Sequence, residues 1–436
     1  MDPASLYDQK RITPKEAAGF LSNGSNLILG MGVAMPPVLM QGVAAALHDE
    51  RLDNINLYYM HGTEALKTSL LAPELREKIK PRPLFLSRHD REALKLYAKP
   101  HMEFIPSALH QAGRLLTEQI EPHCFMVTVS PMDRHGYFSL GTNADYGASV
   151  IRKAKKVVVE VNANMPRTFG EMSVHISEVD AIVEHNEPLM DIPSRPVSDK
   201  DLRIAKQITG HIRDGDTLQM GVGGVPNGVL GQLHNHKNLG LHSELFSPAM
   251  VDLIKSGALN GRQKSWMQHR HVYTLALGDK AMYDFMDDNP SIVGYPASWV
   301  NNPSIIRKNH NMVSVNGAIE IDLTGQINAE TIEGQPFSGT GGQLDFVRGA
   351  YASPGGRSFI ALHSTAKKGT ISRIVPQLKG GTVTDTRMDT HYVVTEHGCV
   401  NLKGLSLPQR ARALIGIAHP DFQDELEQQA FELCLI

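Results

Sequence analysis

The first part of the chain alternates short apolar runs with a glycine turn and a longer apolar stretch. The apolar run 27–29 predicts a strand, and the glycines in segment 30–32 predict a turn directly after it. The apolar stretch 38–47 is long enough to predict a helix. A second strand, predicted at residues 55–58, leads to Glu64 in a His-Gly-Thr-Glu segment. The predicted order is strand, glycine turn, helix and strand.

The same order of signals returns in the second part of the chain. Ser198, followed by Asp201, starts a stretch whose apolar residues recur with helical spacing. The segment 217–220 then predicts a strand, and the glycine turn 221–223 and a further helix follow it. This part leads to Glu244 in a His-Ser-Glu segment, as the first part leads to Glu64.

The repetition predicts the fold class, which is α/β with two tandem, related open domains. We expect an N-terminal domain over residues 1–190, a proline-bearing linker at 191–200 and a C-terminal domain at 201–436. Strands that alternate with helices favour a largely parallel sheet in each domain. Ligands of such sheets bind beyond the carboxyl ends of the strands, where both glycine turns are predicted. We therefore expect the active site between the two domains.

Composition narrows the class of protein. The formal net charge of −3 disfavours a nucleic-acid binder, which normally carries a basic excess. The three cysteines, Cys124, Cys399 and Cys434, are too scattered for a disulfide framework or a metal knuckle. The longest apolar stretch, 26–40, is interrupted by glycines and prolines and is too short to span a bilayer. We expect a soluble cytoplasmic protein that binds neither nucleic acid nor membrane.

Two glycine-rich segments are candidate binding loops. Residues 219–230, QMGVGGVPNGVL, read as strand, turn and helix, an arrangement that presents backbone N–H groups to a ligand. Residues 337–346, FSGTGGQLDF, place three glycines close together. Each segment can equally be a tight turn that needs glycine only for its backbone. Pro226 replaces the third glycine of a dinucleotide fingerprint, and no phosphate-binding P-loop motif is present.

Glu244 is the candidate nucleophile, because a carboxylate can attack an acyl group and split one difficult exchange into two covalent steps. Its repeat counterpart Glu64 has equal standing on local sequence, and a glutamate near an apolar run is more often an ion-pair partner. The histidine groups at 234–242 and 269–271 have no HExxH spacing, which favours structural roles over a metal site. A serine-hydrolase GxSxG elbow is also missing.

Further motifs are spread along essentially the whole chain. In order, the motifs are VEVNANMPRTFG (159–170), GVGGVPNGV (221–229), LHSEL (241–245), GTGGQLDFVRGA (339–350), SRIVP (372–376), TDTRMDTHYVVTEHG (384–398) and AHPDF (418–422). Together they resemble the acetyl-CoA hydrolase/transferase family of class I CoA-transferases, and most closely its 4-hydroxybutyrate and butyrate:acetate CoA-transferase members.

The resemblance implies a CoA-transferase (NagB/RpiA-like) fold and a role for each motif. It implies that Glu244 forms the covalent intermediate, that Asn316 lies near the thioester carbonyl, and that a glycine loop lies beside the thioester at Gly341 and Gly342. It also implies a coenzyme A contact, formed by Gln219, Met220, Gly221, Val222 and Gly223.

The implied reaction is a ping-pong transfer of CoA through a glutamyl-CoA thioester. Its substrates are a short-chain acyl-CoA, such as acetyl-, butyryl- or 4-hydroxybutyryl-CoA, and a carboxylic acid such as acetate. Coenzyme A enters as a co-substrate, and neither a metal nor another cofactor is expected. A homodimer is expected from family habit alone.

Three alternatives remain open on the sequence. An acyl-CoA hydrolase would use the same Glu244 with water as the acceptor. A non-catalytic CoA- or nucleotide-binding protein would bind without a covalent adduct, and a sugar-phosphate isomerase-like enzyme would bind phosphate without thioester reactivity. Lys367, Lys368 and Arg373 are candidate partners for the CoA phosphates.

Overall fold

The chain folds into two compact units of alternating strands and helices. The structure is a computed structural model that describes residues 2–95, 102–192 and 196–436. Unit 1 comprises Met1–Pro193, Phe246–Pro248 and Val272–Val300, and unit 2 comprises Ser194–Leu245, Ala249–His271 and Asn301–Ile436. Pro193, Ser194 and Arg195, within the predicted linker, lie outside the described residues.

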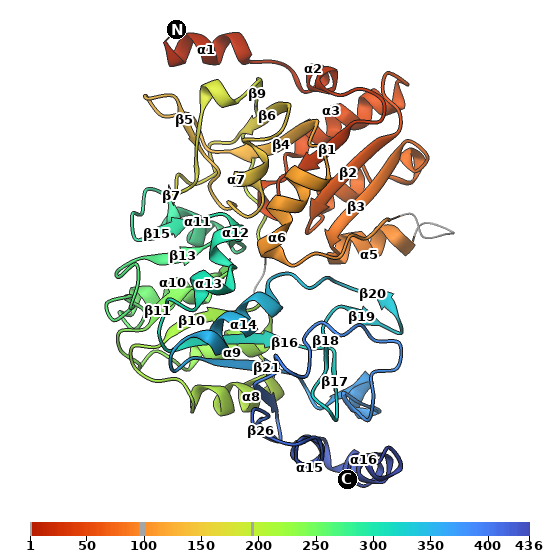
Figure 1. The fold of residues 1–436 in the computed structure, drawn as a ribbon. Helices are drawn as coiled ribbons and strands as arrows, with labels where there is room; N and C mark the ends of the chain where they lie inside the picture. The colour runs from red at the N-terminus through yellow and green to blue at the C-terminus, as the bar shows by residue number, and fades with distance from the viewer. Residues whose placement is uncertain (1, 96–101, 193–195) are drawn as a thin grey trace. The chain divides into compact units, whose positions relative to one another are not determined.

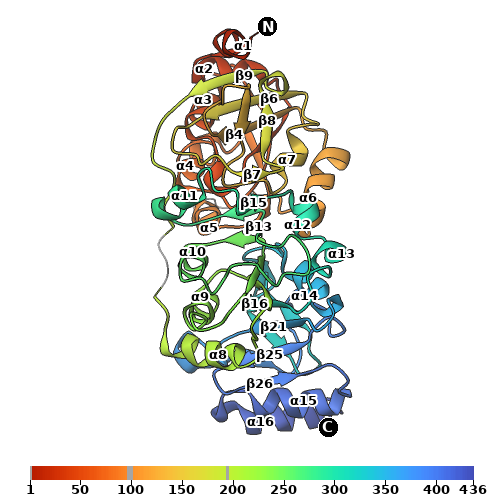
Figure 2. The ribbon, with the colours of Figure 1, turned by 90° about the vertical axis from the view of Figure 1, so that its left-hand side faces the viewer.

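Unit 1 is built on a six-stranded parallel sheet. Across the sheet, the strands are β3 (Ile79–Phe85), β2 (Ile55–Met60), β1 (Asn26–Leu29), β4 (Cys124–Val129), β6 (Lys156–Val161) and β9 (Ala181–Glu184). Helices α2 (Pro14–Ala17) and α3 (Pro37–His48) cover one face, and α6 (Leu109–Arg114) and α7 (Gly147–Val150) cover the other (Figure 2). Leu27 and Leu29 pack in the core under α3, whereas alternate strand residues point to the opposite face.

Unit 2 repeats this plan. Its sheet contains, in order across the sheet, β26 (Gly398–Asn401), β25 (Tyr392–Thr395), β21 (Arg357–Ala361), β16 (Met312–Gly317), β10 (Thr217–Met220) and β11 (Gly240–His242). All neighbours are parallel except the antiparallel pair β25 and β26. Figure 2 shows α8 (Asp199–Thr209) and α9 (Gly224–Gly231) on one side of this sheet, and α13 (Pro303–Ile306) and α14 (Gln343–Ala352) on the other.

The two units confirm the predicted internal repeat. In unit 1 the order is β2-β1-β4-β6-β9, and in unit 2 it is β11-β10-β16-β21-β25. In unit 1, β1 lies between β2 and β4, and in unit 2, β10 lies between β11 and β16. In each case the last of the three strands comes from further along the chain. The predicted strand segments 27–29 and 217–220 lie in β1 and β10, which occupy equivalent places.

The units do not divide at a single point in the sequence. Residues 272–300 were assigned to the C-terminal domain by sequence, but they cluster with unit 1. The physical reason is long-range hydrogen bonding, because β15 (Ile292–Gly294) pairs in parallel with β7 (Phe169–Gly170). The backbone N–H groups of Ala144 and Asp145 also donate to the Thr274 carbonyl oxygen.

Shorter elements complete both units. Figure 1 shows α15 (Leu407–Gly416) and α16 (Pro420–Glu432) at the end of the chain, where their apolar faces join a buried cluster of unit 2. Small strands of unit 2 include β17 (Glu320–Asp322), β18 (Ile327–Asn328), β19 (Thr331–Ile332), β20 (Gln335–Pro336), β22 (Thr365–Ala366), β23 (Ile371–Ser372) and β24 (Ile374–Val375). Among the described residues, no helix is long and apolar enough to cross a bilayer.

Candidate active site

Glu244 lies at the carboxyl edge of the unit 2 sheet, two residues after β11 ends. The strand that leads to it is held firmly, because Leu241 is buried and its carbonyl oxygen accepts a 2.9 Å hydrogen bond from Lys264 Nζ. Burial lowers the pKa of this lysine to about 7. A rigid strand end therefore presents the glutamate.

Two donors hold the Glu244 carboxylate. Asn301 Nδ2 donates to Oε2 over 2.6 Å, and the Gly342 backbone N–H also donates to the carboxylate. The residue keeps partial solvent exposure, as a nucleophile requires. Its dense surroundings nevertheless raise the pKa of Glu244 to about 7, mainly through burial and with help from the charge of Asp345. A carboxyl group with such a pKa titrates near neutral pH and is a candidate for chemistry.

Gly342 has no space for a side chain. A β-carbon at this position would overlap Oε2 of Glu244 and Nδ2 of Asn301. Its neighbour Gly341 has a φ of +55°, a left-handed conformation that side chains disfavour. The structure therefore brings the predicted glycine loop, Gly341 and Gly342, to the predicted nucleophile, and each glycine has its own physical requirement.

Gln219 and Asn316 form a second polar group at the same sheet edge. Their side-chain amides are hydrogen-bonded reciprocally, with both N···O distances at 3.1 Å. Gln219 lies in β10 and Asn316 in the neighbouring parallel strand β16, and β11, which leads to Glu244, pairs with the other edge of β10. The role of Asn316 beside the thioester stays a prediction.

The turn after β10 presents backbone, not large polar side chains. Val222 is 77% exposed at its tip, whereas Met220 is fully buried and can offer a ligand only its backbone. Gly223 has a φ of +132° and precedes the first turn of α9. An open glycine turn at a helix start is compatible with the predicted coenzyme A contact at residues 219–223, which remains a prediction.

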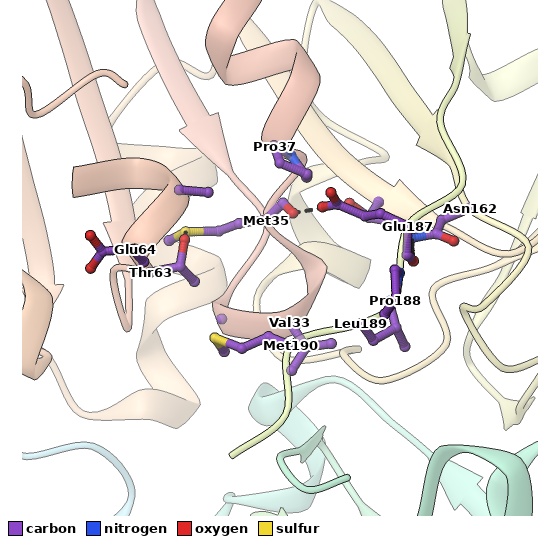
Figure 3. A pocket seen from close by; sticks show the side chains of 13 residues that line it. Val33, Met35, Pro37, Thr63, Glu64, Asn162, Glu187, Pro188, Leu189 and Met190 are labelled. Carbon is purple, nitrogen blue, oxygen red and sulfur yellow. Dashed lines mark hydrogen bonds between the residues drawn. The ribbon is translucent and has the colours of Figure 1, made fainter. Parts of the chain in front are cut away.

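Glu64, the repeat counterpart, has a different environment. It is exposed at the start of α4 (Glu64–Thr68), where it pairs with Lys67 at 2.8 Å and with His89 at 3.0 Å. The hydrogen bond from Lys67 lowers the pKa of Glu64. Figure 3 shows its carboxylate at the margin of a unit 1 pocket of about 160 Å³, pointing away from Leu189 and Met190. The surroundings distinguish the two glutamates, although their local sequences do not.

Side chains that could hold a metal ion come together at one place among the described residues. Glu64, His89 and Glu92 are the one group there with ligand atoms close enough together, but Lys67 already pairs with both carboxylates. The histidines at 234–242 and 269–271 form no such group in the described part of the chain. Burial lowers the pKa of His271 to about 4, which keeps that ring neutral.

Sequence reasoning did not identify Asn301. The Asn-Asn-Pro segment is typical of a helix cap, and Asn302 does cap α13 by accepting from the Ser304 N–H. Asn301 is left to turn toward Glu244, 57 residues earlier in the chain. Lys367 and Lys368, the candidate phosphate partners, are exposed between β22 and β23, and their role stays a prediction.

Two family models match this chain, one in its N-terminal part and one in its C-terminal part. The model of the acetyl-CoA hydrolase/transferase N-terminal domain matches residues 1–193. The model of the acetyl-CoA hydrolase/transferase C-terminal domain matches residues 278–430.

Characterised relatives and a solved structure match over nearly the full length. Succinyl-CoA:cyclohexane-1-carboxylate CoA transferase of Geobacter metallireducens is 42% identical over 97% of this chain and 95% of its own. Butyryl-CoA:acetate CoA-transferase of Anaerostipes caccae is 38% identical, covering 97% and 96%. 4-Hydroxybutyrate coenzyme A transferase of Clostridium kluyveri is 37% identical, covering 98% of each chain. The crystal structure of RipA from Yersinia pestis superimposes with a TM-score of 0.96 at 45% identity over all of both chains.

Proposed function

Because the chain belongs to the acetyl-CoA hydrolase/transferase family and is a CoA-transferase, we propose that Glu244 is its nucleophile. We further propose that the enzyme exchanges CoA between a short-chain acyl-CoA and a carboxylic acid such as acetate. The observation that carries the proposal is the Glu244 carboxylate itself, held by Asn301 and Gly342 in a residue that keeps partial solvent exposure.

The proposed mechanism is ping-pong, with two covalent intermediates. A Glu244 carboxylate oxygen attacks the thioester carbonyl carbon, the carbon–sulfur bond breaks, and CoA leaves as a thiolate, so that an acyl-glutamyl anhydride remains on the enzyme. The thiolate then attacks the glutamyl carbonyl carbon, the free acid leaves as a carboxylate, and a glutamyl-CoA thioester remains. A second carboxylate repeats both steps in reverse. The reaction as written needs no metal or redox group.

The Asn301 and Gly342 donors are placed to stabilise the oxyanion of the second step, in which the thiolate attacks the glutamyl carbon. When the thiolate adds to the glutamyl carbon, the oxyanion forms on an oxygen of Glu244, where Asn301 Nδ2 and the Gly342 N–H already point. Donors that are fixed before the reaction need no reorganisation, and losing one typically costs about 3–4 kcal/mol of barrier height. The resting carboxylate thus occupies the place of the later oxyanion.

The raised pKa of Glu244 has a definite consequence for activity. Only the ionised carboxylate attacks, so a pKa of about 7 means that a substantial fraction is protonated at neutral pH. In exchange, a poorly solvated carboxylate is a stronger nucleophile than one in bulk water. The rate should therefore rise with pH through the neutral range.

The acyl group is the part of the proposal that the relatives define least. Relatives named for cyclohexane-1-carboxylate, butyryl-CoA and 4-hydroxybutyrate are 42%, 38% and 37% identical to this chain, which are similar values. One methylene changes binding in an apolar pocket by only about 1–3 kcal/mol. We propose acetyl-, butyryl- and 4-hydroxybutyryl-CoA as donors to be compared directly with succinyl-CoA.

Location and assembly complete the proposal. The unpaired cysteines Cys124, Cys399 and Cys434 support a reducing cytoplasmic environment. A homodimer is proposed on family resemblance, and light scattering of the purified protein tests it: a single species of twice the chain mass supports it, and a monomer contradicts it.

The experiment is an exchange assay with a panel of donors and acceptors. Each acyl-CoA is incubated with labelled acetate, and labelled acetyl-CoA is measured beside free CoA. Acceptor-dependent acetyl-CoA with little free CoA supports the transferase. Acid and free CoA released at the same rate without acceptor would instead indicate the hydrolase that uses the same glutamate. No turnover with any donor would contradict both.

A further inference from the structure

Two buried carboxylates flank the glycine turn beside Glu244, and the mechanism above uses neither. On one side of the turn, Thr340 Oγ1 donates to Glu330 Oε2 over 3.1 Å. On the other side, Gln343 Nε2 donates to Asp385 Oδ2 over 2.7 Å. The residues just before and just after Gly341 and Gly342 are therefore each tied to a carboxylate.

The segments that carry these two carboxylates are joined by hydrogen bonds. The Ile327 N–H donates to the Asp385 carbonyl oxygen over 3.0 Å, and the Thr384 N–H donates to the Ile327 carbonyl oxygen over 2.7 Å. Thr384 Oγ1 also donates to Glu330 Oε1 over 3.1 Å. The two carboxylates thus share a backbone frame formed by β18 and the segment at 384–385.

Asp385 is an unusual group to place in a protein interior. It is fully buried, and its Oδ1 has no hydrogen-bond partner. Burial raises the pKa of Asp385 to about 7, with nearby Asp389 and Glu330 adding to the effect. An apolar side chain would avoid this desolvation cost, so a buried carboxylate with one oxygen unsatisfied calls for an explanation other than stability.

We propose that Asp385 and Glu330 are positioning residues, which fix the Gly341–Gly342 turn through Gln343 and Thr340 so that the Gly342 N–H stays on the Glu244 carboxylate. Neither residue touches the reacting atoms. The proposal rests on the nucleophilic role of Glu244 stated above. Consecutive glycines are conformationally permissive, so the turn needs external restraint to keep a donor in place. A shift of about 1 Å in such a group can reduce a rate about 100-fold.

The chain offers a matched control on the same helix. Arg348 of α14 pairs with Asp389 at 2.9 Å, which also joins α14 to the 384–390 segment, but this pair is more exposed and has no bond to the turn. Asp389→Ala therefore removes a tie between the same two segments without releasing Gln343. A merely structural role for Asp385 predicts that Asp385→Ala and Asp389→Ala behave alike.

The experiment measures kcat and KM for Asp385→Ala, Asp385→Asn, Gln343→Met, the Asp385→Ala/Gln343→Met double variant and the Asp389→Ala control. We expect Asp385→Ala and Gln343→Met each to lower kcat about 10- to 100-fold, with KM for acyl-CoA changed less than about twofold. Asp385→Asn keeps an oxygen for Gln343 and should restore most of kcat. The double variant should be no slower than the slower single variant, because both changes break one hydrogen bond.

Three results would overturn the proposal. These are an Asp385→Ala kcat equal to that of Asp389→Ala, an effect confined to KM, or single effects that multiply in the double variant. If Asp385→Ala does not fold, Gln343→Met decides alone, since Gln343 is only partly buried. Failure of the nucleophile assignment is distinguishable, because it appears as a covalent CoA adduct that persists in Glu244→Ala.

Discussion

Replacing Gly342 by alanine is the sharpest test of the site geometry. The new β-carbon would overlap Oε2 of Glu244 and Nδ2 of Asn301, so the carboxylate must move away from the amide that holds it. The clash is with the ends of side chains, which can rotate, and not with the backbone. We therefore expect the protein to fold with little change in melting temperature while its activity falls.

The size of the fall follows from the lost interactions. Loss of one fixed donor to a developing oxyanion costs about 3–4 kcal/mol, equivalent to a rate decrease of about 100- to 1,000-fold. Gly342→Ala disturbs both the Gly342 and the Asn301 donors, so we expect kcat to fall at least about 100-fold. The assay is steady-state acyl exchange, measured beside thermal unfolding of the same preparation.

Gly349→Ala is the matched control on the same helix. Its β-carbon would lie 2.6 Å from Cβ of Ile306, in a packed region away from the carboxylate. Overpacking of this kind typically costs about 1–3 kcal/mol of stability, so this variant should melt earlier but keep the kcat of its folded fraction. The reasoning is refuted if Gly342→Ala keeps kcat within threefold of the parent, or if it loses stability as Gly349→Ala does.

Three further predictions concern ionisation and the donors. Asn301→Ala should lower kcat about 100-fold or more and move the pH profile to higher pH, because the amide lowers the pKa of Glu244; a pH–rate series on the variant measures both. For the parent enzyme, kcat/KM should rise with pH through about 7, and a profile that is flat between pH 5.5 and pH 8.5, each about 1.5 units from that value, would contradict Glu244 as the attacking group. Burial raises the pKa of Glu160 from 4.5 to about 8. Between these two pH values the folded state holds a proton that the unfolded state has lost, so the free energy of unfolding falls as pH rises. Glu160→Gln keeps an oxygen for the Val38 and Leu39 N–H groups, so its stability relative to the parent should increase from pH 5 to pH 9, about the ends of that window. Urea unfolding at both pH values measures the difference in free energy of unfolding between variant and parent, and equal differences at the two pH values would refute the prediction.

The repeat and the parallel sheets could be predicted from sequence because apolar runs and turn residues encode them locally. Segments 27–29 and 217–220 were each predicted as a strand followed by a glycine turn, and they lie in the equivalent strands β1 and β10. The membership of residues 272–300 could not be predicted in the same way. It depends on the pairing of β15 with β7, a long-range contact that no local pattern specifies.

The candidate site shows the same limit. Glu64 and Glu244 follow similar strands, and sequence without the family resemblance gave no reason to prefer either. The difference arises from chain segments far away, which surround Glu244 with Asn301 and Gly342 and leave Glu64 paired with Lys67 at the surface. Asn301 was not predicted, because its contact with Glu244 joins residues 57 positions apart and no local pattern specifies it.

In the proposed mechanism, Glu244 carries CoA covalently during turnover. Intact-protein mass spectrometry after mixing with butyryl-CoA, followed by borohydride reduction, tests this step, with Glu244→Ala and Glu64→Ala run in parallel. We expect a CoA adduct in the parent and in Glu64→Ala, lost on reduction with the change mapped to Glu244, and no adduct in Glu244→Ala. An adduct that persists in Glu244→Ala, or its absence from the parent with acetyl-, butyryl-, 4-hydroxybutyryl- and succinyl-CoA alike, would contradict the account.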